Sequence, residues 1–456
     1  MQKAFSLDIN KCTGCQACEV ACAIENQLDA GTSWRRIDTF NARRHPGIPL
    51  FHLSLACNHC ADAPCMEHCP ALAYTKDAET GAVTLHSSLC IGCRYCTWAC
   101  PYDAPIFNDA SGVVEKCTFC NDRLHSGQPP ACVTQCPTGA LRLTDANAAD
   151  GVTNVTGFPR TEAGPAIRFI PLRAGHTVAD TSLPSNPPGN AHDVARPPSK
   201  ISLMSEWPLL VFTLLATLLV VIVAAPNSRA SLDPFAFLIA GIAGAGFSTL
   251  HLGKKLRAHR AILNWRRSWL SREILSYSAF LGIATAHLLT PRLATWGAWA
   301  AILAGFATLF SVDRVYEVTR TRGLRTHSAQ TLLTAMFLLG IVAGALPVVL
   351  VLGLLKATLY TARKMRSRSV HGAGDTRAWI SVIRLGCGIL IPIALLRGGG
   401  EPGVGVWVGV AIGEIIDRCE FYNELEVPTP RLQMAADLAQ ELARSTENFP
   451  GVRRTQ

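Results

Sequence analysis

The residues best suited to chemistry are cysteines, which gather in the first third of the chain. Sixteen of the eighteen lie between Cys12 and Cys136, and only Cys387 and Cys419 lie outside. The sixteen form four groups of four: Cys12, Cys15, Cys18 and Cys22; Cys57, Cys60, Cys65 and Cys69; Cys90, Cys93, Cys96 and Cys100; and Cys117, Cys120, Cys132 and Cys136. Three closely spaced thiolates on a turn can hold three irons of one cube, and a fourth reaches a neighbouring cube. Sixteen such ligands match the needs of four [4Fe–4S] clusters.

Two other uses of cysteine fit this pattern less well. Structural zinc sites use pairs of pairs rather than repeated triplets with a distant fourth ligand. Disulfide scaffolds normally occur in short sequences that follow a signal peptide. The N-terminal stretch MQKAFSLDINKC has neither the basic start nor the apolar core of a signal, and no twin-arginine motif precedes Cys12. We therefore expect metal ligands assembled in the reducing cytosol.

The stretches ACNHCADAPCMEHCP and LCIGCRYCTWACPYDAP, with the fourth group behind them, resemble the four-cluster electron-transfer subunit of the DMSO reductase family of molybdenum enzymes. The resemblance covers about residues 3–145 and implies an α+β double ferredoxin-like domain. In that family the first and fourth groups share clusters, as do the second and third. The implied ligand sets are Cys12, Cys15, Cys18 and Cys136; Cys22, Cys117, Cys120 and Cys132; Cys57, Cys60, Cys65 and Cys100; and Cys69, Cys90, Cys93 and Cys96.

Several charged residues lie beside the cysteines in the sequence, and two interpretations of them stay open. Arg94, Lys116 and Arg123 either raise the cluster potentials electrostatically or are solvated, partner-facing charges. Trp34, Arg35 and Arg36, in the insert between the first two groups, either dock a partner or pack inside the domain.

The rest of the chain divides into a linker, a long apolar region and a tail. Residues 146–205 are rich in Pro, Gly, Asn and Ser, which predicts an extended linker without a packed core. Residues 206–423 alternate long apolar runs with basic loops, and the excess of positive charge lies in this half. Residues 424–456 form a tail with a short amphipathic helix. The expected domains are thus 1–145, 146–205, 206–423 and 424–456.

The apolar runs predict an all-α bundle of eight transmembrane helices. The spans fall at Trp207–Ala225, Pro234–Leu252, Ile274–Leu289, Leu293–Val312, two within Ala329–Ala362, Trp379–Leu396 and Pro402–Phe421. The run Ala329–Ala362 would be about 51 Å long as one helix, whereas a bilayer core is about 30 Å thick. It is therefore split near Gly344 and Pro347. With eight spans, sixteen Lys and Arg lie in the loops on the side of the cysteine domain and three on the other, which predicts a cytoplasmic cysteine domain at the bacterial inner membrane.

His251 ends the second span, directly before the basic stretch LGKKLRAHR. With the segments around EWPLLVF and GEIIDRCEFY, it resembles the quinone-binding anchor of DMSO reductase-type complexes over about residues 203–423. In that family the histidine that matches His251 belongs to the menaquinol site. We therefore expect a quinone site, for menaquinone or ubiquinone, at His251, with Lys255, Arg257, Glu414 and Asp417 as its further candidate residues. An imidazole there can hydrogen-bond a quinone oxygen and exchange its proton, although a histidine that caps a helix end is the plainer alternative.

The predicted spans contain further ionisable groups. Glu414, with Asp417 and Arg418, forms either a proton path or a structural ion pair. Lys356 and Arg384 are expected to extend to the membrane interface. Because His287 lies near the opposite face from His251, no bis-histidine haem is expected.

The sequence shows no catalytic constellation of its own, so the chain is expected to be a non-catalytic redox subunit. By resemblance its partner is a molybdopterin bis-guanine dinucleotide catalytic subunit, and it binds no nucleic acid. We expect a cytoplasm-facing sulfite dehydrogenase that passes electrons to quinone. The alternatives are a menaquinol-oxidising DMSO or other S- or N-oxide reductase in anaerobic respiration, and a non-enzymatic iron–sulfur redox sensor.

Overall fold

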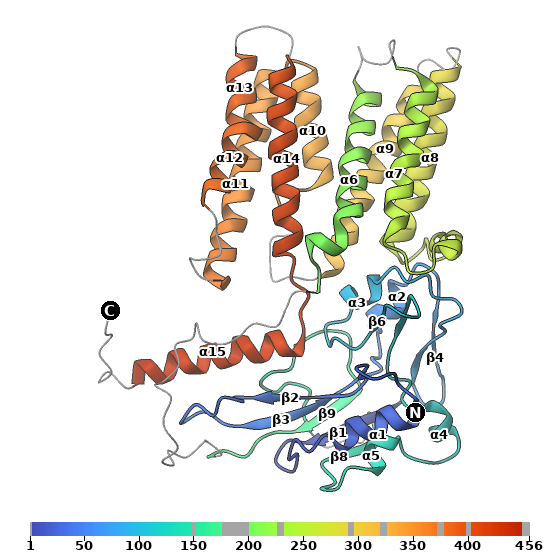
Figure 1. The fold of residues 1–456 in the computed structure, drawn as a ribbon, viewed down its shortest axis with the longest axis vertical. Helices are drawn as coiled ribbons and strands as arrows, with labels where there is room; N and C mark the ends of the chain where they lie inside the picture. Colours follow the sequence, from blue (N-terminus) through green and yellow to red (C-terminus); the bar gives the residue numbers. More distant parts are fainter. Residues whose placement is uncertain are drawn as a thin grey trace. The chain divides into compact units, whose positions relative to one another are not determined.

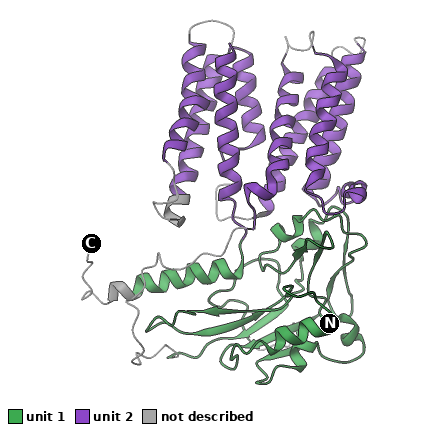
Figure 2. Cartoon of the chain, in the orientation of Figure 1, with its two compact units in different colours: residues 1–198, 428–456 green, residues 199–427 purple. Residues whose placement is uncertain are grey.

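The computed structural model describes residues 2–147, 151–175, 200–225, 232–290, 296–319, 326–371, 378–397 and 403–448. The protein forms two compact units (Figure 2). Unit 1 comprises residues 1–198 and 428–456, and unit 2 comprises residues 199–427. The chain thus leaves unit 1 once and returns to it.

Unit 1 is centred on a three-stranded sheet of order β8-β1-β9 (Figure 1). β1 (Lys3–Asp8) pairs antiparallel with β8 (Leu141–Asp145) and parallel with β9 (Ile167–Ile170). Phe5 and Leu7 point into the core, as the alternation of a half-buried strand requires. Because β1 leads into Cys12 and β8 follows Cys136, this pairing brings the two ends of the cysteine region together.

Three hairpins and five short helices complete the cysteine region. The hairpins are β2 (Arg36–Phe40) with β3 (Phe51–Leu55), β4 (Tyr74–Lys76) with β5 (Val83–Leu85), and β6 (Ile106–Asn108) with β7 (Val113–Glu115). The helices are α1 (Ala17–Glu25), α2 (Pro64–Glu67), α3 (Tyr95–Ala99), α4 (Asn121–His125) and α5 (Ala131–Thr134). Small sheets and short helices around the cysteine loops confirm an α+β domain here.

The structure differs from the expected linker at residues 151–175. Residues 167–170 form β9, and Phe158 and Phe169 are buried with their rings in edge contact, 4.9 Å between centroids. The Pro- and Gly-rich composition concealed a strand because its four residues pair with β1, more than 150 positions earlier. The part of the predicted linker at residues 176–199 lies outside the described residues.

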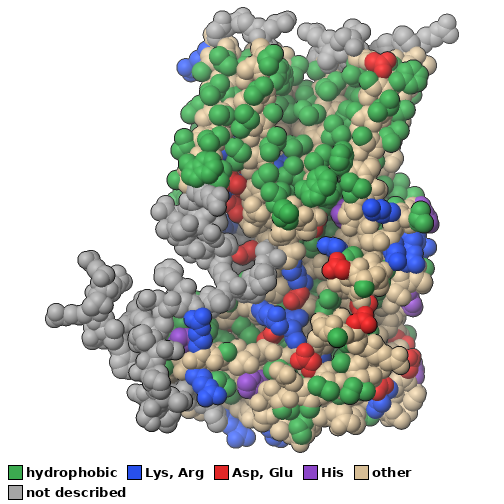
Figure 3. Space-filling model, viewed as in Figure 1, with side chains coloured by type: hydrophobic (Ala, Val, Ile, Leu, Met, Phe, Trp, Pro, Cys, Tyr) green, Lys and Arg blue, Asp and Glu red, His purple; other side chains and the backbone are tan. Residues whose placement is uncertain are grey.

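Unit 2 is helical, and its visible surface shows many apolar side chains and few charged ones (Figure 3). Its elements are α6 (Leu203–Ala224), α7 (Pro234–Leu250), η3 (Lys255–Ile262), α8 (Trp269–Leu289), α9 (Trp296–Tyr316), η5 (Glu317–Thr319), α10 (Thr331–Val342), α11 (Leu346–His371), α12 (Ala378–Leu385), η7 (Gly386–Leu390), α13 (Ile391–Leu396) and α14 (Val404–Glu424). Within the described ranges, four helices are long and apolar enough to cross a membrane, and the bent pair α7 and η3 adds a fifth candidate. The predicted helical membrane region is confirmed, but an exact count of eight spans is not.

The long apolar run between residues 329 and 362 is broken where the sequence predicts. α10 ends at Val342 and α11 begins at Leu346. Gly344 lies between them with φ of +63°, a left-handed conformation that glycine adopts without steric cost. α10 has only 12 residues, about 18 Å of helix, so it is shorter than a full bilayer core.

The C-terminal tail is a packed part of unit 1 rather than a separate segment. α15 (Pro430–Asn448) lies against β2 through an ion pair between Arg431 Nε and Asp38 Oδ1, 2.7 Å apart. The backbone N–H of Gly157 donates to Asp437 at 2.7 Å. Together these contacts join the last helix to both the cysteine region and the segment before β9.

Candidate functional site

Each cysteine group begins with the same backbone turn. The residue two positions after the first cysteine has a positive φ in all four groups, namely Gly14, His59, Gly92 and Phe119. In three of them this residue donates its N–H to the first thiol, with N–S distances of 3.5 Å at His59, 3.4 Å at Gly92 and 3.3 Å at Phe119. Such donors stabilise thiolates, so the turn fits cluster ligands and explains the C-x2-C spacing.

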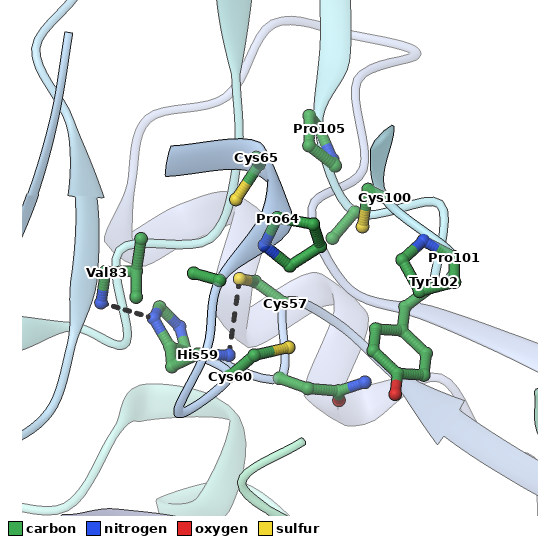
Figure 4. Close-up of a pocket in the computed structure, with 13 residues that line it drawn as sticks. Cys57, His59, Cys60, Pro64, Cys65, Val83, Cys100, Pro101, Tyr102 and Pro105 are labelled. Atoms are coloured by element: carbon green, nitrogen blue, oxygen red, sulfur yellow. Dashed lines mark hydrogen bonds between the residues drawn. The ribbon is translucent and has the colours of Figure 1, made fainter. Parts of the chain in front are cut away.

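Two sets of four thiols surround pockets. The first pocket is lined by Cys57, Cys60, Cys65 and Cys100, with Pro64 and Pro101 beside them (Figure 4). The second is lined by Cys12, Cys15, Cys18 and Cys136. We call the set that contains Cys12 group A and the set that contains Cys57 group C. These letters denote thiols that lie together in space, in contrast to the four groups of the sequence. Both sets are the ones that the family resemblance implies.

The remaining eight thiols also form two sets, whose members lie close enough that each raises the pKa of its neighbours by like-charge repulsion. Group B consists of Cys22, Cys117, Cys120 and Cys132, in which Cys22 interacts with each of the other three. Group D consists of Cys69, Cys90, Cys93 and Cys96, in which Cys69 and Cys90 both interact with Cys93 and Cys96. Most of these thiols are buried, whereas Cys15 of group A is exposed.

Burial keeps the isolated thiols protonated. It raises the pKa of the Cys22 thiol to about 12, although the Arg35 guanidinium opposes the shift. A cluster ligand must be a thiolate, so cluster insertion here displaces protons. Four thiols, a turn of inward N–H donors and a mostly apolar pocket lining fit a [4Fe–4S] cube.

Two cations are buried among the thiols. The Arg35 side chain lies over the Phe5 ring and donates from Nη1 to Ser54 Oγ at 3.0 Å, and Ser54 Oγ lies 3.3 Å from Cys18 Sγ. Lys116 Nζ lies 3.5 Å from Cys57 Sγ and donates to the carbonyls of Val83 and Cys117. Burial disfavours the charged ammonium, but the thiols of Cys57, Cys65 and Cys117 outweigh it and raise the pKa of Lys116.

The other charges near the cysteines lie at the surface. Arg94 stacks on Phe107 and pairs with Asp109 at 3.5 Å, and Arg123 pairs with Glu25 at 3.2 Å. Of the open alternatives, Lys116 is therefore an internal charge, whereas Arg94 and Arg123 are solvated ion pairs. Arg35 packs inside the domain instead of docking a partner.

His251 lies at a sharp bend in unit 2. It follows the last residue of α7, and the chain turns by 105° into η3. Lys255 is exposed and Arg257 is half-buried in η3. An imidazole at the end of an apolar helix, beside a basic turn, can hydrogen-bond the polar end of a lipid-soluble molecule.

The structure places Glu414 and Asp417 in a different environment, a buried ion network of α10, α11, α12 and α14. Lys356 Nζ lies 3.1 Å from Glu414 Oε2, and Arg384 Nη2 lies 2.7 Å from Asp417 Oδ2. Thr334 donates to Glu414 and Ser328 to Asp417, both at 2.8 Å. The expectation that Lys356 and Arg384 extend to the interface is wrong, because both are fully buried ion-pair partners.

The network continues toward the C-terminal end of α14. Arg363 bridges Asp417 at 2.9 Å and Glu424 at 2.8 Å, and Lys364 pairs with Glu420 at 2.6 Å. α14 also approaches η7 closely, since a Cβ added to Gly388 would lie 2.8 Å from Gly413 Cα. Of the two alternatives for Glu414, the contacts favour structural ion pairing, with Lys356 and Arg384 as partners rather than Arg418.

Glu273 is a candidate that sequence reasoning missed. It lies in α8, which follows η3, and its carboxyl group is buried at 5% exposure near Asp313. The signal was present, because Glu273 is an acidic residue at the start of an apolar run.

The chain matches two families of known proteins. Residues 48–146 match the 4Fe-4S dicluster domain, and residues 202–372 match the DMSO reductase anchor subunit (DmsC). The chain is 41% identical over 149 residues to a component of the anaerobic dimethyl sulfoxide reductase of Haemophilus influenzae, covering 31% of this chain and 72% of that one. It is 43% identical over 140 residues to the thiosulfate reductase electron transfer subunit PhsB of Salmonella typhi, covering 30% and 72%. It is 40% identical over 144 residues to a tetrathionate reductase subunit of Salmonella typhimurium, covering 31% and 57%.

Proposed function

Because this protein belongs to the DMSO reductase family of iron–sulfur electron-transfer subunits, here fused to a membrane anchor, we propose that it carries electrons from a membrane quinol to a molybdopterin catalytic subunit. The observation that carries this proposal is the presence of four convergent thiol groups and a DmsC-type helical unit in one polypeptide. Covalent fusion keeps the two parts of the relay at fixed stoichiometry.

The relatives favour one direction of electron flow. Their names describe reductases of dimethyl sulfoxide, thiosulfate and tetrathionate. This supports the alternative of a quinol-oxidising reductase of a sulfur compound, and the comparisons do not support the sulfite dehydrogenase that we expected first.

Groups A to D are the proposed ligands of four [4Fe–4S] clusters, which when bound exchange single electrons with their neighbours. Group A is the proposed end of the relay toward the catalytic partner, since Cys15 is exposed and Cys12 and Cys136 are partly so. Two large apolar side chains on α1, Val20 and Ile24, are exposed just beyond it and offer a contact surface.

His251 is the proposed quinol ligand. Its imidazole would accept a hydrogen bond from a quinol hydroxyl and then the proton, while Lys255 and Arg257 hold the polar end of the ring near the membrane surface. Glu273 is a second proposed proton acceptor. Glu414 and Asp417, which belonged to our predicted quinone site, are engaged in ion pairs, so we assign them a structural role.

The topology that we propose has an even number of membrane crossings. Residues 1–198 and 428–456 belong to one unit, so the chain must return to the side from which it entered. The excess of Lys and Arg in the loops on that side favours the cytoplasmic face of a bacterial inner membrane.

The test is an assay of the complex purified from membranes with this protein as bait. We expect a molybdopterin protein to co-purify and the complex to oxidise a quinol with DMSO, thiosulfate or tetrathionate as acceptor. A complex that reduces quinone with sulfite, and reduces none of these acceptors, would overturn the proposed direction. Recovery of the chain without iron would overturn the relay itself.

A further inference from the structure

We propose that Arg35 and Lys116 set the reduction potentials of the iron–sulfur clusters, each acting on the two clusters between which it lies. Arg35 acts on the clusters of groups A and B, and Lys116 on those of groups B and C. This inference rests on the proposed cluster assignment and deepens it, because it states which residues of the chain control the relay.

Arg35 lies at the junction of groups A and B. It is 1% exposed, and the thiols with which it interacts are Cys18 of group A and Cys22, Cys117 and Cys132 of group B. Nη1 is bonded to Ser54, which also contacts Cys18. Nε and Nη2 are buried without a hydrogen-bond partner among the described residues. Half of the guanidinium therefore faces the thiols rather than a carboxylate.

Lys116 lies at the junction of groups B and C. It precedes Cys117 of group B in the sequence, and its Nζ is 3.5 Å from Cys57 Sγ of group C. Next to it, the His59 ring stacks on the Phe119 ring at 4.5 Å, joining the first turns of the same two groups. Its other partners are backbone carbonyls, which leave its positive charge uncompensated.

The third junction, between groups C and D, has no such cation among the described residues. The residue buried there is Tyr74, which interacts with Cys65 of group C and with Cys69 and Cys96 of group D. A neutral phenol exerts a far weaker field than a full charge. The three junctions from group A to group D therefore hold a cation, a second cation and a neutral group. Removal of either cation should shift cluster potentials more than substitution of Tyr74 does.

The physical basis is the charge of the cluster. Reduction adds one negative charge, so a nearby cation stabilises the reduced form more than the oxidised form and raises the potential. A charge buried in protein is poorly screened by salt and water, in contrast to one at the surface. Burying a cation without a carboxylate is costly, and an anionic cluster on each side supplies the compensation that the protein itself lacks here.

The experiment is a redox titration of the purified full-length complex followed by electron paramagnetic resonance, with iron and sulfide measured in each sample. In Lys116→Met, the reduced-to-oxidised ratio of two clusters should fall about tenfold at fixed potential, or about 59 mV for one electron, and the other two should not change. Arg35→Met should lower a different pair that shares one cluster with the first. In the double variant the midpoint potential of the shared cluster, that of group B, should fall by the sum of the two single shifts, and no other cluster should show such a sum.

Three controls separate this effect from a loss of structure. Lys116→Arg keeps the charge and should restore the wild-type titration. Lys76→Met removes a partly exposed cation whose Nζ donates to the Cys60 carbonyl at 3.1 Å, and should shift its nearest cluster less than Lys116→Met does. Tyr74→Phe removes a hydroxyl but no charge, and should shift no midpoint as far as Lys116→Met does.

Full iron content with four unchanged midpoints in both Met variants would overturn the inference, and so would an equal shift of all four clusters. If Lys116→Met loses iron, Lys116→Gln, which retains a donor for the Val83 carbonyl, takes its place under the same criteria. Either of these negative results would leave the proposed function intact. In this experiment the proposed function would fail only if the wild-type protein contained no iron.

Discussion

The two units of the molecule bury cations in opposite ways. In unit 2, Lys356 and Arg384 each meet a buried carboxylate, at 3.1 and 2.7 Å respectively. In unit 1, Arg35 and Lys116 are as deeply buried, yet they form no ion pair with a carboxylate among the described residues and contact carbonyls, a hydroxyl and thiols instead.

The difference indicates where each unit obtains its negative charge. The helical unit encodes both signs, so Lys356 and Arg384 meet carboxylates of the same unit when the helices pack. The cysteine unit encodes the cations and the thiol ligands, and the anionic clusters must complete it. Substitution of a buried cation in unit 2, the helical unit, should therefore affect stability. Substitution of a buried cation in unit 1, the cysteine unit, should affect redox behaviour and the response to iron.

The largest expected effect is that of Asp417→Asn. This change leaves Arg384 and Arg363 without their shared carboxylate inside the bundle, and breaking a buried pair costs about 3–5 kcal/mol. The measurement is thermal unfolding of the purified protein in detergent.

A matched variant makes this prediction specific to charge. Arg384→Met combined with Asp417→Leu removes both signs and should be less destabilising than Asp417→Asn alone. A double variant that is at least as unstable as the single one would contradict the view that charge pairing, rather than packing, holds α12 to α14.

Lys116→Met should lower stability by a smaller amount, which depends on iron. In the iron-free protein it removes the donor to the buried Val83 and Cys117 carbonyls and should cost about 1–3 kcal/mol. With clusters bound the loss should be larger, because the positive charge that faces the anionic clusters is lost as well. Unfolding of the chelated and intact proteins, compared side by side, checks this difference, and an identical effect in the two forms would remove the contrast between the units.

A smaller loss of stability is expected at the half-exposed ion pair of Arg431 and Asp38. Arg431→Ala breaks the contact of α15 with Asp38, where the arginine side chain is 53% exposed, and should cost about 0–1 kcal/mol. The effect should weaken in about 1 M salt. A loss as large as that from Asp417→Asn would mean that α15 is essential to unit 1 rather than an addition to it.

The smallest effect is expected at the surface pair of His125 and Asp77, whose Nε2 and Oδ2 atoms are 2.9 Å apart. The hydrogen bond to Asp77 raises the pKa of His125. The stabilisation is therefore full below the unfolded pKa of about 6.5 and is lost as pH rises through the higher folded value. The Tm difference between wild type and His125→Gln should be measurable at pH 5.5 and absent at pH 9, and a difference that grows with pH would contradict the pairing.

Local spacing was enough to predict the iron–sulfur domain, because a C-x2-C turn is formed by residues that are adjacent in the sequence. The break at Gly344 was predictable for the same reason, from length and one glycine. What the sequence concealed is long-range pairing. Lys116 meets Cys57 across 59 positions and Lys356 meets Glu414 across 58, so neither partner could be inferred from its neighbours. β9 was missed because four residues in a polar stretch become a strand only beside β1.

The central claim is that quinol bound at His251 supplies electrons to the clusters of the same polypeptide. It is tested most directly by adding a menaquinol analogue to the oxidised, anaerobically purified protein and recording cluster reduction by electron paramagnetic resonance. Wild type should show a reduced cluster signal, while His251→Ala, with its full iron content, should show little or none. Equal reduction in both proteins would contradict the account.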